Sequence, residues 1–216
     1  MIQRRHAYLL LCLIAVSACY ITDPSDGPGD WDGMDEFRVN SLDQYSMSAH
    51  EGKVDVWSVE EGRLVAKSDG TTSRARLVRQ DEQMRDGRLQ IESSQMANGA
   101  ILFRFQENGD HYRLEIRDDE TSYYNMTVRN FELYAKVLGA EESVLSEDLD
   151  LPRGSPFSVS VEFVGDHVSM YLNGERVSEA VHSGLSNAGS VGLGYGDLLT
   201  PGEEAHFEVF RWRSLD

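Results

Sequence analysis

Short segments in which apolar and polar residues alternate constrain this chain more than any other feature. Phe157-Ser158-Val159-Ser160-Val161-Glu162-Phe163 alternates without a break, and Asn173-Gly174 follows a second alternating run. A period of two predicts strands that are buried on one side, and Asn-Gly is the strongest short signal for a hairpin. About twelve or thirteen such runs follow one another, separated by turn residues every 8–12 positions or so.

This spacing predicts an all-β fold, either an antiparallel sandwich or a barrel. The sequence lacks the alternation of strands and helices that is typical of a parallel α/β sheet. No stretch of ten or more residues has helical periodicity, and we expect at most one short helical turn, in residues 144–151.

Residues 1–18 have the three regions of a bacterial export signal. Arg4 and Arg5 precede an apolar run of about ten residues, which is too short to span a bilayer. Val16-Ser17-Ala18-Cys19 resembles the bacterial lipobox, which implies cleavage before Cys19 and lipid attachment to its thiol. The alternative is an ordinary secretion signal with an incidental cysteine. Because Tyr20 stands where an Asp would mark retention in the inner membrane, we expect a lipid anchor in the cell envelope, at the outer membrane.

Three segments follow from this interpretation: a lipoprotein signal peptide (1–18), an acidic flexible tether (19–35) and one domain (36–216). The whole chain has 20 basic and 37 acidic residues, a formal charge of −17. Removing the signal removes two arginines and no acid, which leaves −19. We therefore do not expect a nucleic acid as the partner, because a protein that binds nucleic acid needs a basic face.

Metal sites have weak support in the sequence. Asp30-Trp31-Asp32-Gly33 resembles the start of a calcium loop, but Val39 stands where the loop requires Glu. Calcium in this segment is an alternative to a plain acidic linker. No two of the six histidines lie two to four residues apart, so local metal-ligand spacing is missing, and we expect no other cofactor.

Several segments resemble the concanavalin A-like sandwiches, in particular the laminin G-like and 3-keto-disaccharide hydrolase domains. Val56 to Leu64 is similar to their opening W-x-V-x-D/E-G-x-L, and Asn98 to Phe105 is similar to their N-S-G-I-x-F-R strand. Val161 to Gly174 and Gly189 to Gly194 resemble later pieces in the same order. The resemblance covers residues 34–216 and implies a two-sheet antiparallel jelly-roll sandwich. It implies fold more than function, because these are mostly turn and core positions.

The sequence lacks the pattern of catalytic carboxylates that is typical of retaining glycosidases of this fold. Family 16 enzymes of the same fold have Glu-x-Asp-x-x-Glu on one strand, which places their carboxylates on one face. The nearest stretch, Glu115 to Glu120, has Arg117 at the middle position. We therefore expect no catalytic residue of that type.

Alternation predicts a polar binding face instead. If Ile101, Phe103 and Phe105 point inward, then Leu102, Arg104 and Gln106 point outward. The same rule turns outward the polar residues of two further strands: Arg113, Glu115 and Arg117, and Arg88, Gln90 and Glu92. Planar polar groups beside tyrosine rings suit a sugar, against the alternative of a solvated face with cross-strand ion pairs. The ligand-binding candidates are Arg104, Arg113, Glu115, Arg117, Tyr123, Tyr124 and Tyr134.

The expected function is a non-catalytic, lipid-anchored binding module for a carbohydrate or another surface ligand. One alternative is a sugar-active hydrolase or lyase with His111 and Glu115 near Arg104, as the keto-disaccharide resemblance implies. The other is a structural or adhesive envelope lipoprotein, which predicts an exposed apolar patch of several hundred Å².

Overall fold

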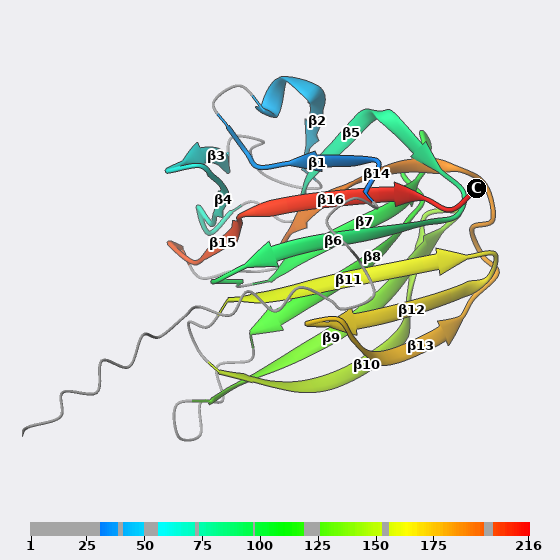
Figure 1. Ribbon diagram of the computed structural model, residues 1–216. Coiled ribbons are helices and arrows are strands. Elements are labelled where there is room, and N and C mark those ends of the chain that lie inside the picture. The colour runs from blue at the N-terminus through cyan, green and yellow to red at the C-terminus, as the bar shows by residue number, and fades with distance from the viewer. Residues whose placement is uncertain are drawn as a thin grey trace, which may run out of the picture.

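The fold is nearly all β (Figure 1). The computed structural model describes residues 31–38, 41–49, 56–71, 74–96, 98–118, 126–152, 156–196 and 201–216, with residues 117–118, 126–132 and 148–152 described by their backbone alone. In this part of the chain sixteen strands and one 3-10 helix, η1 (Ser41–Gln44), are present. None of its helices is long and apolar enough to cross a membrane.

Two large antiparallel sheets form the layers of a sandwich, and a small sheet lies at one end (Figure 1). The six-stranded sheet has the order β1 (Gly33–Asp35), β16 (Val209–Ser214), β6 (Gly87–Ser93), β11 (Phe157–Val164), β12 (His167–Leu172) and β13 (Glu175–Val181). The seven-stranded sheet has the order β10 (Ala140–Pro152), β9 (Met126–Val137), β8 (His111–Asp118), β7 (Gly99–Phe105), β14 (Gly189–Tyr195), β5 (Ala75–Met84) and β2 (Tyr45–Ser48). The small sheet has the order β15 (Glu204–Phe207), β4 (Arg63–Lys67) and β3 (Trp57–Glu60). The expected two-sheet jelly-roll sandwich is confirmed.

The core lies between the two large sheets and follows the alternation. Leu89 and Ile91 of β6 are completely buried, while Arg88, Gln90 and Glu92, which alternate with them, are only partly buried. In β8 Tyr112, Leu114 and Ile116 are completely buried, as their positions predicted. One continuous cluster of buried apolar side chains fills this layer, which is the main source of stability for a sandwich of this kind.

Two hairpins show how turn chemistry sets the register. Asn173 and Gly174 both have positive φ, 50° and 81°, as an Asn-Gly turn requires. Leu138 and Gly139, between β9 and β10, adopt the same conformation at 51° and 79°. Leucine is unfavourable there, and the Asp110 carboxylate supports the turn by accepting hydrogen bonds from both amides, at 2.9 and 3.1 Å. These bonds lower the pKa of Asp110.

Two expectations need correction. The tether was expected to extend through residue 35, but Gly33–Asp35 form strand β1 and pair with β16 at Phe210–Trp212. The helical turn expected in residues 144–151 is wrong, because these residues belong to β10. The irregular pattern that hid this strand has a cause: a register shift between Ser143 and Leu145 changes which residues share a face.

A second bulge changes the direction of Arg104. Phe103 and Arg104 together oppose Val191, since β14 pairs Gly192 with Leu102 and Ser190 with Phe105. Arg104 has φ of 49°, in the left-handed region. The expected outward orientation of Arg104 is therefore wrong: its side chain is completely buried, because the extra residue breaks the alternation at this point.

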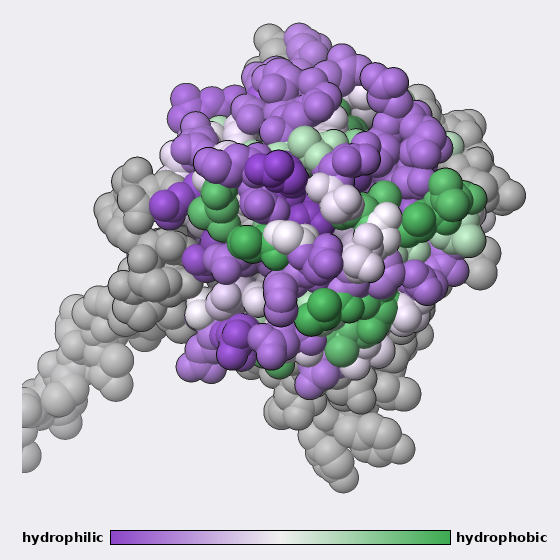
Figure 2. All heavy atoms as spheres, turned by 90° about the vertical axis from the view of Figure 1, so that its right-hand side faces the viewer, coloured by the Kyte–Doolittle hydropathy of each residue, from purple (hydrophilic) through white to green (hydrophobic). Residues whose placement is uncertain are grey.

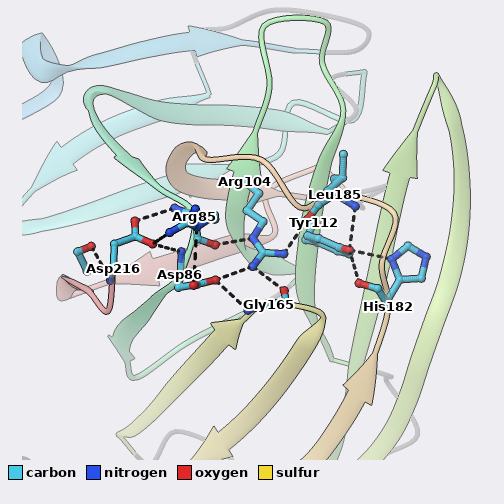
Figure 3. Close-up of polar contacts among 9 residues, drawn as sticks. Arg85, Asp86, Arg104, Tyr112, Gly165, His182, Leu185 and Asp216 are labelled. Carbon is cyan, nitrogen blue, oxygen red and sulfur yellow. Dashed lines mark hydrogen bonds and ion pairs between the residues drawn. The ribbon is translucent and has the colours of Figure 1, made fainter.

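The Arg104 guanidinium contacts three segments that connect strands: the β5–β6 turn, the β11–β12 turn and the segment before β14 (Figure 3). Nε donates to the Arg85 carbonyl at 2.7 Å and Nη2 contacts the Asp86 carboxylate at 3.2 Å, both in the β5–β6 turn. Nη2 also donates to the Gly165 carbonyl at 2.7 Å, in the β11–β12 turn, and Nη1 donates to the Leu185 carbonyl at 2.6 Å, before β14. Four hydrogen bonds, one of which is also the ion pair with Asp86, thus compensate the burial of this charge.

Replacing Arg104 with Met is expected to lower the free energy of unfolding by about 3–5 kcal/mol, because it leaves a carboxylate and three carbonyls without their donor. Urea unfolding measures this loss. Arg176→Met is the matched control, since it removes the same charge from an exposed ion pair with Glu179, and a change within about 0.5 kcal/mol is expected. Equal effects of the two substitutions would contradict the role assigned to Arg104.

Candidate functional site

Three titratable residues of β8 lie on the outer face of the seven-stranded sheet, the face turned away from the core. In β8 His111, Arg113 and Glu115 alternate with core residues, so all three lie on this outer face. They are nevertheless buried, with 1%, 6% and 2% of their surfaces exposed. Other side chains on this face therefore cover them.

The outer face is concave. Nη1 of Arg74, just before β5, lies 2.8 Å from Oε2 of Glu141 in β10. Four strands separate β10 from β5, so a flat sheet would place them about 24 Å apart at about 4.8 Å per step. Extended Arg and Glu side chains together span roughly half of that distance. The sheet must therefore curl, and the Arg74–Glu141 ion pair bridges the resulting groove.

The floor of this groove consists of small or apolar residues. Ala100 and Leu102 of β7 lie beside Gly194 of β14, where a Cβ would approach Ala100 to 3.2 Å and Leu102 to 3.4 Å. The cavity above them has an empty volume of about 250 Å³, including space open to solvent, and its walls include Arg74, Arg76, Arg113 and Glu115. We call this cavity with its walls the concave groove.

Arg113 has an unusual environment on one wall of the groove. Its Nη2 lies 3.0 Å from Oε2 of Glu115 and its Nη1 lies 3.5 Å from Oε2 of Glu141. The ring of Tyr134, opposite Arg113 on β9, packs 4.7 Å from the guanidinium carbon. The N–H groups do not point along these contacts, so the guanidinium is ion-paired while none of its three nitrogens has a hydrogen-bond acceptor in the described residues. Buried donors without acceptors are rare and call for an explanation.

Aromatic groups and a second cation lie along the same face. The bulge at Arg104 turns Phe105 outward, and its ring centroid lies 5.2 Å from that of His111. The Arg76 guanidinium lies 5.7 Å from the Phe105 ring. Burial is the main cause that lowers the pKa of His111 to about 3, and the positive charges of Arg76, Arg113 and Lys136 add to it. His111 is therefore neutral at pH 7, with Nδ1 held 2.8 Å from the Gly109 carbonyl.

The candidates predicted from the sequence do not all meet. Arg113 and Glu115 line the concave groove, and Tyr134 packs against Arg113 beside it. Arg104 lies elsewhere, buried in the network of Figure 3. The backbone of Arg117 belongs to β8, and its side chain lies outside the described residues. Tyr123 and Tyr124 also lie outside them.

Sequence reasoning missed Arg74, Arg76 and Glu141. The pattern Arg74-Ala75-Arg76-Leu77 does contain a signal, because Ala75 and Leu77 are core residues and the arginines alternate with them. Glu141 has no local signal, since its approach to Arg74 depends on strand order and curvature.

The described residues contain no group of three or more His, Cys, Asp or Glu placed to hold a metal ion. Of the segment considered for calcium, Asp30 lies outside the described residues, and the Asp32 carboxylate accepts a hydrogen bond from the Ser214 amide at 2.7 Å. Cys19 also lies outside the described residues.

Several solved structures with the same fold are carbohydrate-related proteins. The carbohydrate-binding module CBM66 from Bacillus subtilis is 15% identical, with a TM-score of 0.54 over 78% of this chain and 95% of that one. The kappa-carrageenase from Pseudoalteromonas carrageenovora is 12% identical, with a TM-score of 0.57 over 88% and 98%. The Bacillus licheniformis beta-glucanase is 10% identical, with a TM-score of 0.57 over 86% and 99%. At these identities the likeness concerns the fold alone.

No curated protein matches the sequence. The family described as the 3-keto-alpha-glucoside-1,2-lyase-like domain matches residues 34–207, which is most of the sandwich. This agrees with the resemblance of the turn and core residues to the keto-disaccharide group of concanavalin A-like folds. The chain is thus a carbohydrate-related jelly-roll domain, and it belongs to the 3-keto-alpha-glucoside-1,2-lyase-like family.

Proposed function

We propose that this protein binds a carbohydrate in the concave groove without transforming it. The observation that carries the proposal is Arg113, a nine-tenths buried guanidinium on the groove wall whose nitrogens have no hydrogen-bond acceptor in the described residues. A ligand rich in oxygen atoms supplies such acceptors, and sugars are ligands of this kind.

The rest of the groove suits a sugar ring. At Ala100 and Gly194 the floor has no side chain larger than a methyl group. Tyr134 is half-buried beside Arg113 and offers an aromatic surface on which the C–H groups of a sugar pack. Solved neighbours of the same fold include a carbohydrate-binding module, which supports the proposal by analogy.

An adhesive function has less support. Among the described residues, six large apolar side chains are exposed, and they belong to separate elements: Met34, Met47, Leu138, Val164, Val181 and Leu215. The face of the molecule in Figure 2 has small separate hydrophobic patches on a mostly hydrophilic surface. A protein-binding surface is expected to be larger and continuous.

We further propose that a lipid on Cys19 holds the domain at the bacterial cell envelope, at the outer membrane. The support is the sequence of residues 1–19, with two arginines, a short apolar run and a cysteine after small residues. Several acyl chains would make the attachment stable.

A second candidate function is elimination on a 3-keto-α-glucoside, which the family description names. In such a step a base takes the proton from C2, next to the keto group, and the C1 substituent leaves with its electron pair. Glu115 is the base that the groove offers, and Arg113 at 3.0 Å would stabilise the negative charge that develops on the keto oxygen.

Glycan binding is expected to weaken about ten-fold in Tyr134→Ala, because the aromatic surface is lost. A glycan array identifies a bound oligosaccharide, and calorimetry measures its affinity. Tyr171→Ala is the matched control, since Tyr171 is also half-buried and its ring lies 5.0 Å from the Arg88 guanidinium, on the other sheet. Equal losses in both variants, or an array without a hit, would contradict the proposal.

If the second function operates, the protein consumes a 3-keto-α-glucoside and Glu115→Gln reduces the rate at least about 100-fold, since a general base contributes on that order. Product formation is followed by chromatography, with Glu179→Gln as the control for loss of one negative charge. No turnover by the unmodified protein leaves binding as the function. Turnover that survives in Glu115→Gln removes the role assigned to Glu115.

Cys19→Ser is expected to move the protein from the membrane fraction to the soluble fraction, because the serine cannot take the lipid. Cell fractionation with immunodetection measures the distribution. Because Cys19 also adjoins the predicted cleavage site, the electrophoretic mobility of the original protein and of the variant is compared. This comparison checks that the signal is removed from both. Membrane partition that does not change refutes the anchor.

A further inference from the structure

We propose that the ligand of the concave groove is an acidic saccharide, whose carboxylate takes the place that Glu141 now occupies between Arg74 and Arg113. This inference rests on the proposed carbohydrate function and specifies the class of sugar. It assigns Glu141 a role as an internal competitor of the ligand.

The position of Glu141 is that of a bound carboxylate. A single oxygen, Oε2, lies 2.8 Å from Nη1 of Arg74 and 3.5 Å from Nη1 of Arg113. The two arginines stand on different strands, one before β5 and the other on β8, so the carboxylate links two walls of the groove. A ligand that occupies the groove must displace this bridge or pass beneath it.

The groove retains donors that Glu141 does not satisfy. All three nitrogens of Arg113 are buried and lack hydrogen-bond acceptors in the described part of the chain. A guanidinium and a carboxylate match in a planar arrangement with two parallel hydrogen bonds, which the long 3.5 Å contact does not achieve. The carboxylate of a uronic acid, which is not tied to β10, is free to take this geometry.

The local charge favours an anion, in contrast to the whole chain. Among the side chains that the structure describes here, Arg74, Arg76 and Arg113 face Glu115 and Glu141, an excess of one positive charge with the bridge closed. Once the ligand displaces Glu141, these three arginines face one carboxylate of the described set, that of Glu115. The complete sequence has a formal charge of −17, so a cationic groove stands out as a site for an anionic group.

Two substitutions break the same ion pair and are expected to have opposite effects. Glu141→Gln removes the competing charge and should tighten the binding of an acidic oligosaccharide about ten-fold, as expected if the closed bridge is dominant. Arg74→Gln removes a ligand contact and should weaken it. A merely structural bridge would shift both affinities in the same direction. Glu179→Gln, in the exposed pair with Arg176, controls for net charge.

The probes are tetrasaccharides of galacturonate, mannuronate and hyaluronan, each compared by calorimetry with its methyl ester on the whole chain. We expect at least one acid to bind about ten-fold more tightly than its neutral ester and to respond to the two substitutions as described. A kappa-carrageenan oligosaccharide has sulfate and no carboxylate. If it alone binds, the assignment of a carboxylate is overturned.

The outcomes separate this inference from the proposed function. Esters that bind as tightly as acids, or an affinity for the acids that Glu141→Gln does not raise, overturn the acidic ligand while the groove remains a carbohydrate site. If no acidic probe binds to either form, the inference also falls. Binding of a neutral glycan that is lost in Tyr134→Ala but kept in Tyr171→Ala would then still support the proposed function.

Discussion

The buried guanidinium of Arg104 holds together the end of the sandwich at which three chain connections meet. Its donors reach the β5–β6 turn, the β11–β12 turn and the segment before β14, and two of these connections cross between the large sheets. A charge at this depth is tolerated only because each contact is hydrogen-bonded. The left-handed backbone at Arg104 costs about 1–2 kcal/mol, and the network compensates it. The same bulge turns Phe105 out of the core toward His111, so one irregular residue shapes both the core and the groove.

The groove results from curvature combined with small residues. Curling brings Arg74 and Glu141 within 2.8 Å although four strands separate them. Ala100 and Gly194 keep the floor low between walls with long charged side chains. Residues that would be solvated on a flat sheet are buried here, which explains why Arg113 and Glu115 are almost inaccessible although they lie outside the core.

Family and fold place the protein among carbohydrate-related domains, and the groove supplies the chemistry. The family description names an elimination on a keto-glucoside, whereas the structural neighbours include both a binding module and glycoside-cleaving enzymes. The same side chains serve either proposal: Arg113 as an anion or oxyanion partner, and Glu115 as its counter-charge or as a base. In both cases the Glu141 carboxylate is ion-paired with Arg74 and Arg113, two residues of the groove walls.

Alternation and turn residues determined the fold class, because apolar residues with a period of two must be buried on one side wherever the strands lie. They also predicted that Tyr112, Leu114 and Ile116 face the core, with Arg113 and Glu115 on the other side. Alternation could not place Arg104 or Phe105, because a bulge is set by pairing with a distant strand. Nor could it bring Glu141 to Arg74, since only the order and curling of the seven strands create that contact. Local periodicity thus decided which side each residue faces, and the tertiary structure decided which residues meet there.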